Sequence, residues 1–262
     1  MTTTVSPSTA IEASGAHPEK SEWETRVDLA ACYRLVAKYG MSDLVYNHIT
    51  ARVPGSSDHI LINAFGYLYE EMTASSLYKI DLDGGVVERP DSPYDFPRSG
   101  YVIHGAIHAA RKDAGCVLHT HTRATMAVST MECGLLPLTQ HAMRFYGNVA
   151  YHDYEGVSVD EDEKARLSAD LGDKNVMFLR NHGLLICAPS IAEAFNMCYW
   201  VEMACKAQVD AMSSGAQLIE PSEEIRLKTA RSFDPLARRR FGELEWEAMI
   251  RLLDRTDPSY RD

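Results

Sequence analysis

Two histidines separated by one residue follow a short apolar run in the middle of the chain. His119 and His121 come directly after the run Cys-Val-Leu at residues 116–118. Successive side chains of an extended segment alternate between faces, so both imidazoles leave the same side of the backbone. Neutral imidazoles suit zinc, iron, manganese and cobalt ions. An H-x-H pair is half of a metal site, and its spacing alone leaves a structural role for both rings open.

A third ligand is expected from a separate apolar segment. His182 lies in the sequence LRNHGLLI, at the break between two runs that are typical of buried strands. A side chain at such a break projects from a strand edge into a cleft. Three histidines with an open coordination position are typical of catalytic rather than structural metal sites. The best candidates for such a centre are His119, His121 and His182.

Five other histidines rank lower as metal ligands. His104 and His108 stand four residues apart on a predicted helix and could pair on a metal, but no glutamate lies between them as in zincin motifs. The histidines of predicted strand segments are expected to be hydrogen-bonded parts of the fold; they are His48, His59 and His152.

Helices and strands must position these side chains. Residues 21–39 are predicted to form a helix, since Ser21 and Glu24 form an S-x-x-E capping box. The histidine pair follows a short buried strand at residues 116–119. Strands interleaved with helices place the chain in the α/β or α+β class.

Three parts are predicted along the chain. Residues 1–20 are rich in Ser, Thr, Pro and Ala and are expected to be a disordered tail. Residues 21–215 form the domain that carries the candidate site. Residues 216–262 are more polar and are expected to form a helical extension that packs on the domain or on a neighbouring subunit.

The charge balance argues against several classes of partner. The chain has 26 basic and 37 acidic side chains and a formal net charge of −11, whereas nucleic acids and anionic membranes require a basic surface. No apolar stretch approaches the roughly 20 residues of a membrane helix, and the N-terminus lacks a secretory signal pattern. The six cysteines are scattered without a CxxC pair, which favours reduced thiols and a cytoplasmic location.

Five segments resemble the class II aldolase/adducin family and occur in the family's order. They are NHITARVP (47–54), LINAFGYLYEEMTASSLYKIDLDG (61–84), VLHTHTRATMAVSTMECGLLPL (117–138), VAYHDYEG (149–156) and LRNHGLLIC (179–187). The resemblance implies an α/β fold, a three-layer α/β/α sandwich around a mainly antiparallel sheet. It also implies a homotetramer with active sites between subunits and a small-molecule substrate.

The resemblance agrees with the choice of metal ligands. In the family's sugar-phosphate aldolases, the HxH pair and the His of the NHG or HHG motif bind zinc, and the matching positions are His119, His121 and His182. The expected cofactor is Zn²⁺, with Fe²⁺ or Mn²⁺ as alternatives. The ion would polarise a carbonyl or enediolate oxygen and stabilise the charge that develops when a C–C bond breaks.

The sequence departs from these aldolases at their acid/base. Their S-S-E motif reads Arg98-Ser99-Gly100 here, so Gly100 stands in place of the catalytic glutamate. Losing a general base costs orders of magnitude in rate, and standard sugar-phosphate aldolase chemistry is therefore not expected. Asn47 and Gly66 match the family, and together with Ser99 they are the expected substrate-binding residues.

Other side chains are candidates for the proton-transfer role. His141 occupies the region where an aldolase places a tyrosine from the neighbouring subunit, and Tyr154 and Glu155 offer a phenol and a carboxylate. We expect a metal-dependent lyase that performs aldol cleavage or decarboxylation, and decarboxylation better tolerates the change at Gly100. Two alternatives stay open, a non-haem Fe²⁺ oxygenase acting on an arylpyruvate and a non-catalytic adducin-like interaction module.

Overall fold

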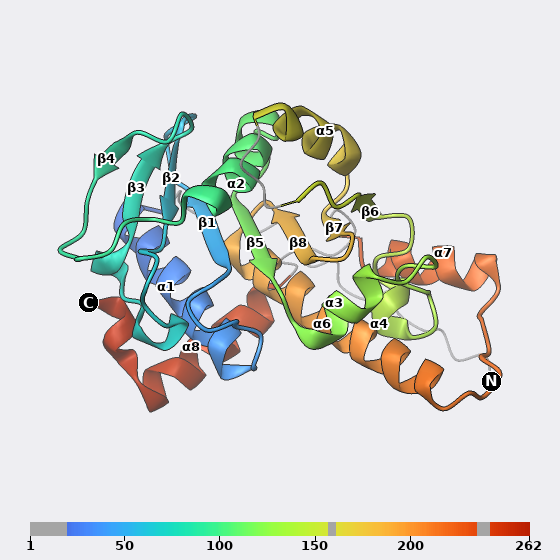
Figure 1. The fold of residues 1–262 in the computed structure, drawn as a ribbon. Coiled ribbons are helices and arrows are strands. Elements are labelled where there is room, and N and C mark those ends of the chain that lie inside the picture. Colours follow the sequence, from blue (N-terminus) through green and yellow to red (C-terminus); the bar gives the residue numbers. More distant parts are fainter. Residues whose placement is uncertain (1–19, 157–160, 235–241) are drawn as a thin grey trace, which may run out of the picture.

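The computed structural model describes residues 20–156, 161–234 and 242–262, within which one eight-stranded sheet forms the centre of the fold (Figure 1). The strands are β1 His48–Arg52, β2 His59–Ile62, β3 Tyr78–Asp81, β4 Val86–Glu88, β5 Cys116–Thr120, β6 Val149–His152, β7 Val176–Leu179 and β8 Gly183–Ala188. Their order is β4-β3-β2-β1-β5-β8-β7-β6. Only β6 and β7 pair in parallel, so the predicted mainly antiparallel sheet is confirmed.

Helices cover both faces of the sheet. The helices are α1 Glu22–Lys38, α2 Arg98–Ala110, α3 Arg123–Ser129, α4 Gln140–Met143, α5 Glu161–Leu171, α6 Ile191–Ser213, α7 Glu223–Ser232 and α8 Glu243–Thr256, with short 3₁₀ turns η1 Tyr69–Glu71, η2 Ala74–Ser76 and η3 Pro258–Arg261. In Figure 1, α2 and α5 lie together on one face, and α1, α6 and α8 lie on the other. This is the three-layer α/β/α sandwich that the family resemblance implies.

The central strands are buried on both faces. In β5, Cys116 and Leu118 join the core beneath α1 and α6, whereas Val117 joins the core beneath α2 and α5. In β7, Phe178 and Met177 divide between the two cores in the same way. Side chains alternate between the two faces with a period of two, so packing against both cores specifies the register of these strands.

The helix predicted over residues 21–39 forms as α1. Ser21 Oγ accepts a hydrogen bond from the amide of Glu24 at 3.2 Å, and the Ser21 amide donates to the Glu24 carboxylate at 2.8 Å. This reciprocal pair satisfies two backbone donors that the first turn cannot use, a contribution of about 1 kcal/mol.

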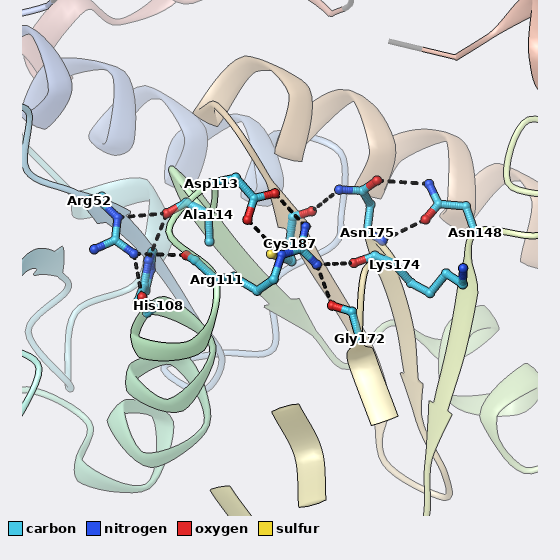
Figure 2. A network of polar contacts seen from close by, with 10 residues as sticks. All are labelled: Arg52, His108, Arg111, Asp113, Ala114, Asn148, Gly172, Lys174, Asn175 and Cys187. Carbon is cyan, nitrogen blue, oxygen red and sulfur yellow. Dashed lines mark hydrogen bonds and ion pairs between the residues drawn. The ribbon is translucent and has the colours of Figure 1, made fainter. Parts of the chain in front are cut away.

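A network of polar contacts ties the end of α2 to the sheet (Figure 2). Arg52 of β1 donates to the carbonyl of His108 at 2.6 Å and to that of Ala114 at 3.2 Å. Arg111 donates to the carbonyls of Gly172 at 2.9 Å and Lys174 at 3.0 Å. The two guanidinium groups thus satisfy carbonyls that have no partner within a helix or strand, and they fix α2 against β1 and the start of β7.

The C-terminal segment contains two helices that pack on different parts of the domain. Trp246 of α8 is buried against Phe195 of α6, with ring centroids 6.0 Å apart, and α7 lies against α4. The predicted tail, residues 1–20, lies outside the described residues except for Lys20. Across the described ranges, no helix has both the length and the apolar run needed to cross a bilayer.

Replacing Trp246 by alanine should lower the free energy of unfolding by about 3 kcal/mol, because it leaves a cavity where α8 meets α6. Leu244→Ala on the same helix is the matched control, since Leu244 is 68% exposed and its truncation should change stability by less than about 0.5 kcal/mol. Urea denaturation of both variants measures the difference. Equal stabilities would mean that α8 adds nothing to the folded domain.

Candidate metal centre and cleft

The three predicted ligands come together at one end of the central strands. His119 lies near the end of β5, His121 follows that strand, and His182 occupies the turn between β7 and β8. The Nε2 atom of His121 lies 2.7 Å from Nε2 of His119 and 2.8 Å from Nε2 of His182. The donor atoms of all three rings lie within 4.8 Å of one another.

Hydrogen bonds on the other ring nitrogens decide which nitrogen carries the proton. His119 Nδ1 lies 2.9 Å from the carbonyl of Leu184, and His121 Nδ1 lies 3.1 Å from Oδ2 of Asp43. A carbonyl and a carboxylate only accept, so both Nδ1 atoms carry hydrogen and both Nε2 atoms present lone pairs. Two facing lone pairs repel each other unless a cation lies between them. The residues therefore fit a divalent metal.

Burial keeps His119 and His182 in the uncharged form that binds metals. Burial, followed by the neighbouring His121, holds the pKa of His119 well below its usual value. The same two causes lower the pKa of His182 to about 4. Both rings are consequently neutral near pH 7, which is the protonation state a metal ligand requires.

A cleft of about 510 Å³ opens beside the three histidines. Its apolar wall includes Tyr46, Phe65 and Met126, and its polar wall includes Asn47 and Asn181. A few convergent polar groups on an apolar wall are typical of sites for small molecules. The volume suits a small oxygenated compound better than a polymer.

Asn47 and Asn181 adopt backbone conformations that are uncommon for residues other than glycine. Their φ angles are +71° and +57°, and such strain is concentrated at functional sites. The Asn47 side chain is 4% exposed, and neither of its amide atoms has a hydrogen-bond partner among the described residues. A buried amide that lines a cleft without a partner can be satisfied by a ligand. The geometry is thus compatible with the predicted role of Asn47 in substrate binding.

The other two predicted substrate-binding residues contribute differently. Gly66 has a φ of +139°, and a Cβ there would lie 2.7 Å from the Tyr94 ring. This glycine therefore lets the chain turn beside Phe65, which lines the cleft. Ser99 lies in the first turn of α2, and its side chain is outside the described part of the structure. The roles of Gly66 and Ser99 stay predictions.

The space beside Gly100, the predicted place of the aldolases' glutamate, is occupied by another side chain. Gly100 lines the cleft together with His48, and a Cβ at position 100 would lie 2.1 Å from Cδ2 of His48. The backbone at Gly100 therefore has no room for any side chain while the His48 ring is present. Burial, followed by His121 and His182, lowers the pKa of His48 to about 3.

The three predicted proton-transfer residues lie in different surroundings. Tyr154 lines the cleft, with its ring centroid 6.2 Å from that of His182. Glu155 accepts from Arg166 Nε at 2.8 Å, which lowers the pKa of its carboxyl. His141 lies on α4 with its ring 4.3 Å from that of Trp200. Glu155 and His141 are not among the residues that line the cleft of a single chain, and all three roles stay predictions.

Two groups of this site are not evident from the sequence. Asp43, which binds His121, lies in an irregular segment where no spacing signals a contact 78 residues away. His48 was interpreted as structural because a single histidine in a strand gives no indication of which wall it faces. The NHITARVP segment was the available signal for His48, since it also contains Asn47.

Comparison with known proteins shows close relatives for nearly the whole chain. Residues 27–209 match the family model of the Class II Aldolase and Adducin N-terminal domain. An aldolase II superfamily protein from Pseudomonas syringae shares 48% identity and a TM-score of 0.88, over 94% of this chain and 98% of its own. L-fuculose 1-phosphate aldolase from Glaciozyma antarctica shares 26% identity and a TM-score of 0.81, over 92% and 93%. Alpha-adducin from Rattus norvegicus is 42% identical, over 93% of this chain but 35% of its own length.

Asp43→Asn should weaken Zn²⁺ binding about 10–100-fold, because the carboxylate orients His121 and increases the basicity of its Nε2. Asp210→Asn, which changes an exposed carboxylate on α6, is the matched control and should leave the affinity unchanged. Competition with a chromophoric chelator measures both. Identical affinities for the two variants would show that Asp43 does not support the metal ligand.

Proposed function

This chain belongs to the class II aldolase and adducin family, and from this premise we propose that it is a divalent-metal-dependent lyase. Its reaction would be aldol cleavage or decarboxylation of a small oxygenated carbonyl compound or carboxylic acid. The observation that carries the proposal is the convergence of three imidazole Nε2 atoms, at least two of which lack a proton, beside a cleft of about 510 Å³.

Zn²⁺ is the expected ion, held by His119, His121 and His182. When bound, it would polarise a substrate oxygen and stabilise the negative charge that develops as a C–C bond breaks. The chain supplies the remaining functions. Asn47 offers substrate oxygens an amide that has no partner among the described residues.

The relatives support a lyase without deciding the substrate. The Glaciozyma antarctica relative is an L-fuculose 1-phosphate aldolase, which supports C–C bond cleavage as the class of reaction. Decarboxylation needs no acceptor for a hydroxyl proton, so it is the reaction less affected by Gly100. Aldol cleavage requires a different acceptor in that position.

A non-catalytic role is the second candidate, favoured by the 42% identity to alpha-adducin. This chain spans 35% of the length of alpha-adducin. The activity of the whole adducin molecule is therefore not expected of this chain. The three convergent imidazoles favour the enzyme, because a purely structural role gives no reason to direct unprotonated nitrogens at one another.

A second copy of the chain is the proposed source of the remaining catalytic group. His141 is not among the residues that line the cleft of its own chain, so we expect it to act in catalysis at the cleft of a neighbouring subunit. The proposed assembly is a homotetramer, as expected from the family resemblance.

Purified without chelators, the protein should contain about one Zn²⁺, Fe²⁺ or Mn²⁺ per chain, and His119→Ala should lose it. Removing the ion should lower turnover at least about 10²-fold, since metals contribute several kcal/mol to such reactions. Elemental analysis and substrate screens measure these effects. If the ion is zinc or manganese, aldol and decarboxylation substrates are screened. If it is iron, oxygen uptake with arylpyruvates is measured. An empty site even after reconstitution would refute the enzyme and favour an adducin-like module.

Mixed assemblies test the role of His141 in the neighbouring subunit. His119→Ala and His141→Gln chains should each be inactive alone, and co-assembled chains should regain activity because some clefts then have both groups intact. Turnover of refolded mixtures, with light scattering to measure the assembly, tests this. Mixtures as inactive as their components would place His141 outside the reaction.

A further inference from the structure

A chain of buried hydrogen bonds runs from the cleft through the interior to the end of α2. His48 Nδ1 lies 2.9 Å from His104 Nε2, and His104 Nδ1 lies 2.9 Å from Thr50 Oγ1. Thr50 Oγ1 lies 2.8 Å from His108 Nε2, and His108 Nδ1 lies 3.1 Å from the carbonyl of Ala114. Thr50, His104 and His108 are fully buried, so water does not compete for these bonds.

The carbonyl at the end sets the direction of every bond in this chain. A carbonyl only accepts, so His108 Nδ1 carries the proton and His108 Nε2 accepts from the Thr50 hydroxyl. The Thr50 oxygen then accepts from His104 Nδ1, and His104 Nε2 accepts from His48 Nδ1. Because a neutral imidazole has one N–H, His48 Nε2 is left as a lone pair.

Arg52 donates to the carbonyl at the end of this chain. Its guanidinium donates to the same Ala114 carbonyl at 3.2 Å and to the backbone carbonyl of His108 at 2.6 Å, as Figure 2 shows. A guanidinium has donors and no acceptor. Arg52 therefore cannot replace the carbonyl as the acceptor of the His108 Nδ1 proton. A reversed chain would set an unprotonated His108 Nδ1 against the Ala114 carbonyl oxygen, two acceptors with no proton between them.

The lone pair at the other end faces the position of the absent carboxylate. A Cβ built on Gly100 would lie 2.3 Å from His48 Nε2, and both residues line the cleft. His48 also pairs directly with the metal ligand His119 across β1 and β5. An acceptor thus stands beside the metal site, supplied by β1 instead of α2.

We propose that His48 Nε2 is the hydrogen-bond acceptor for a substrate hydroxyl, and that Thr50, His104 and His108 are positioning residues that fix its tautomer. This inference rests on the proposed function for its substrate, which would carry a hydroxyl close to the carbonyl or carboxyl group. It gives the cleft a neutral acceptor where the family's aldolases have a charged one. The tautomer itself can be tested without any turnover.

Long-range ¹H–¹⁵N spectra of the full chain, labelled at histidine and free of metal, distinguish protonated from unprotonated ring nitrogens. His48→Gln identifies the His48 signals. The expected result is a proton on Nδ1 of His48 and none on Nε2. A proton on Nε2, or exchange between both tautomers, would overturn the assignment. Failure of every substrate screen would refute the lyase but would not change these spectra, so the two failures are distinguishable.

Thr50→Val tests the positioning residues. Without the hydroxyl, His104 Nδ1 loses its acceptor, and the proton on His48 should shift wholly or partly to Nε2, while Thr50→Ser should retain the wild-type tautomer. A structural role alone predicts lower stability of Thr50→Val with the His48 tautomer unchanged, and this result would overturn the proposal. If Thr50→Val does not fold, the wild-type spectrum still decides the direction of the chain.

Binding of 3-hydroxypropionate and propionate to the zinc-loaded protein tests the acceptor itself. The ratio of the affinity for 3-hydroxypropionate to that for propionate should be about tenfold higher in the wild type than in His48→Phe, since one hydrogen bond is worth about 1.4 kcal/mol. Any contact of the hydroxyl with zinc is common to both proteins and cancels in this comparison. An equal preference in the two proteins would show that the hydroxyl does not bind His48.

Discussion

β1 and β5 lie side by side at the centre of the sheet, and their antiparallel register places His48 directly opposite His119. The next pairing, between β5 and β8, brings the Leu184 carbonyl to Nδ1 of His119. A slip of one residue in either pairing would turn the histidines to the opposite face. Two apolar cores on the two faces of these strands oppose such a slip, so the chemistry of the cleft depends on the packing of side chains that never contact a substrate.

A side chain at position 100 and the His48 ring would occupy the same space. The Cβ of any residue at position 100 would lie 2.1 Å from the His48 ring, so the site holds either a side chain from α2 or an imidazole from β1. The family resemblance predicts only that a carboxylate is missing at this position. The geometry adds that the space is filled by a polar ring whose orientation is fixed by hydrogen bonds in the interior.

The sequence predicted features that local periodicity determines. The H-x-H spacing brought His119 and His121 to one side because strands alternate with a period of two, and the capping box placed the start of α1. Sequence spacing could not predict the contact of Asp43 with His121, because an irregular segment brings the two together across 78 residues. It also could not assign His48, since its surroundings depend on how α2 packs against β1.

In both groups of histidines, an acceptor on one ring nitrogen determines what the other nitrogen can do. The Leu184 carbonyl holds the proton of His119 on Nδ1, which leaves Nε2 for a metal. The Ala114 carbonyl acts on His108 and, through two further residues, on His48. A fold shared with adducins does not specify this chemistry by itself. What distinguishes a metal ligand or a substrate acceptor from a core histidine is therefore the nitrogen that the surrounding acceptors leave without a proton.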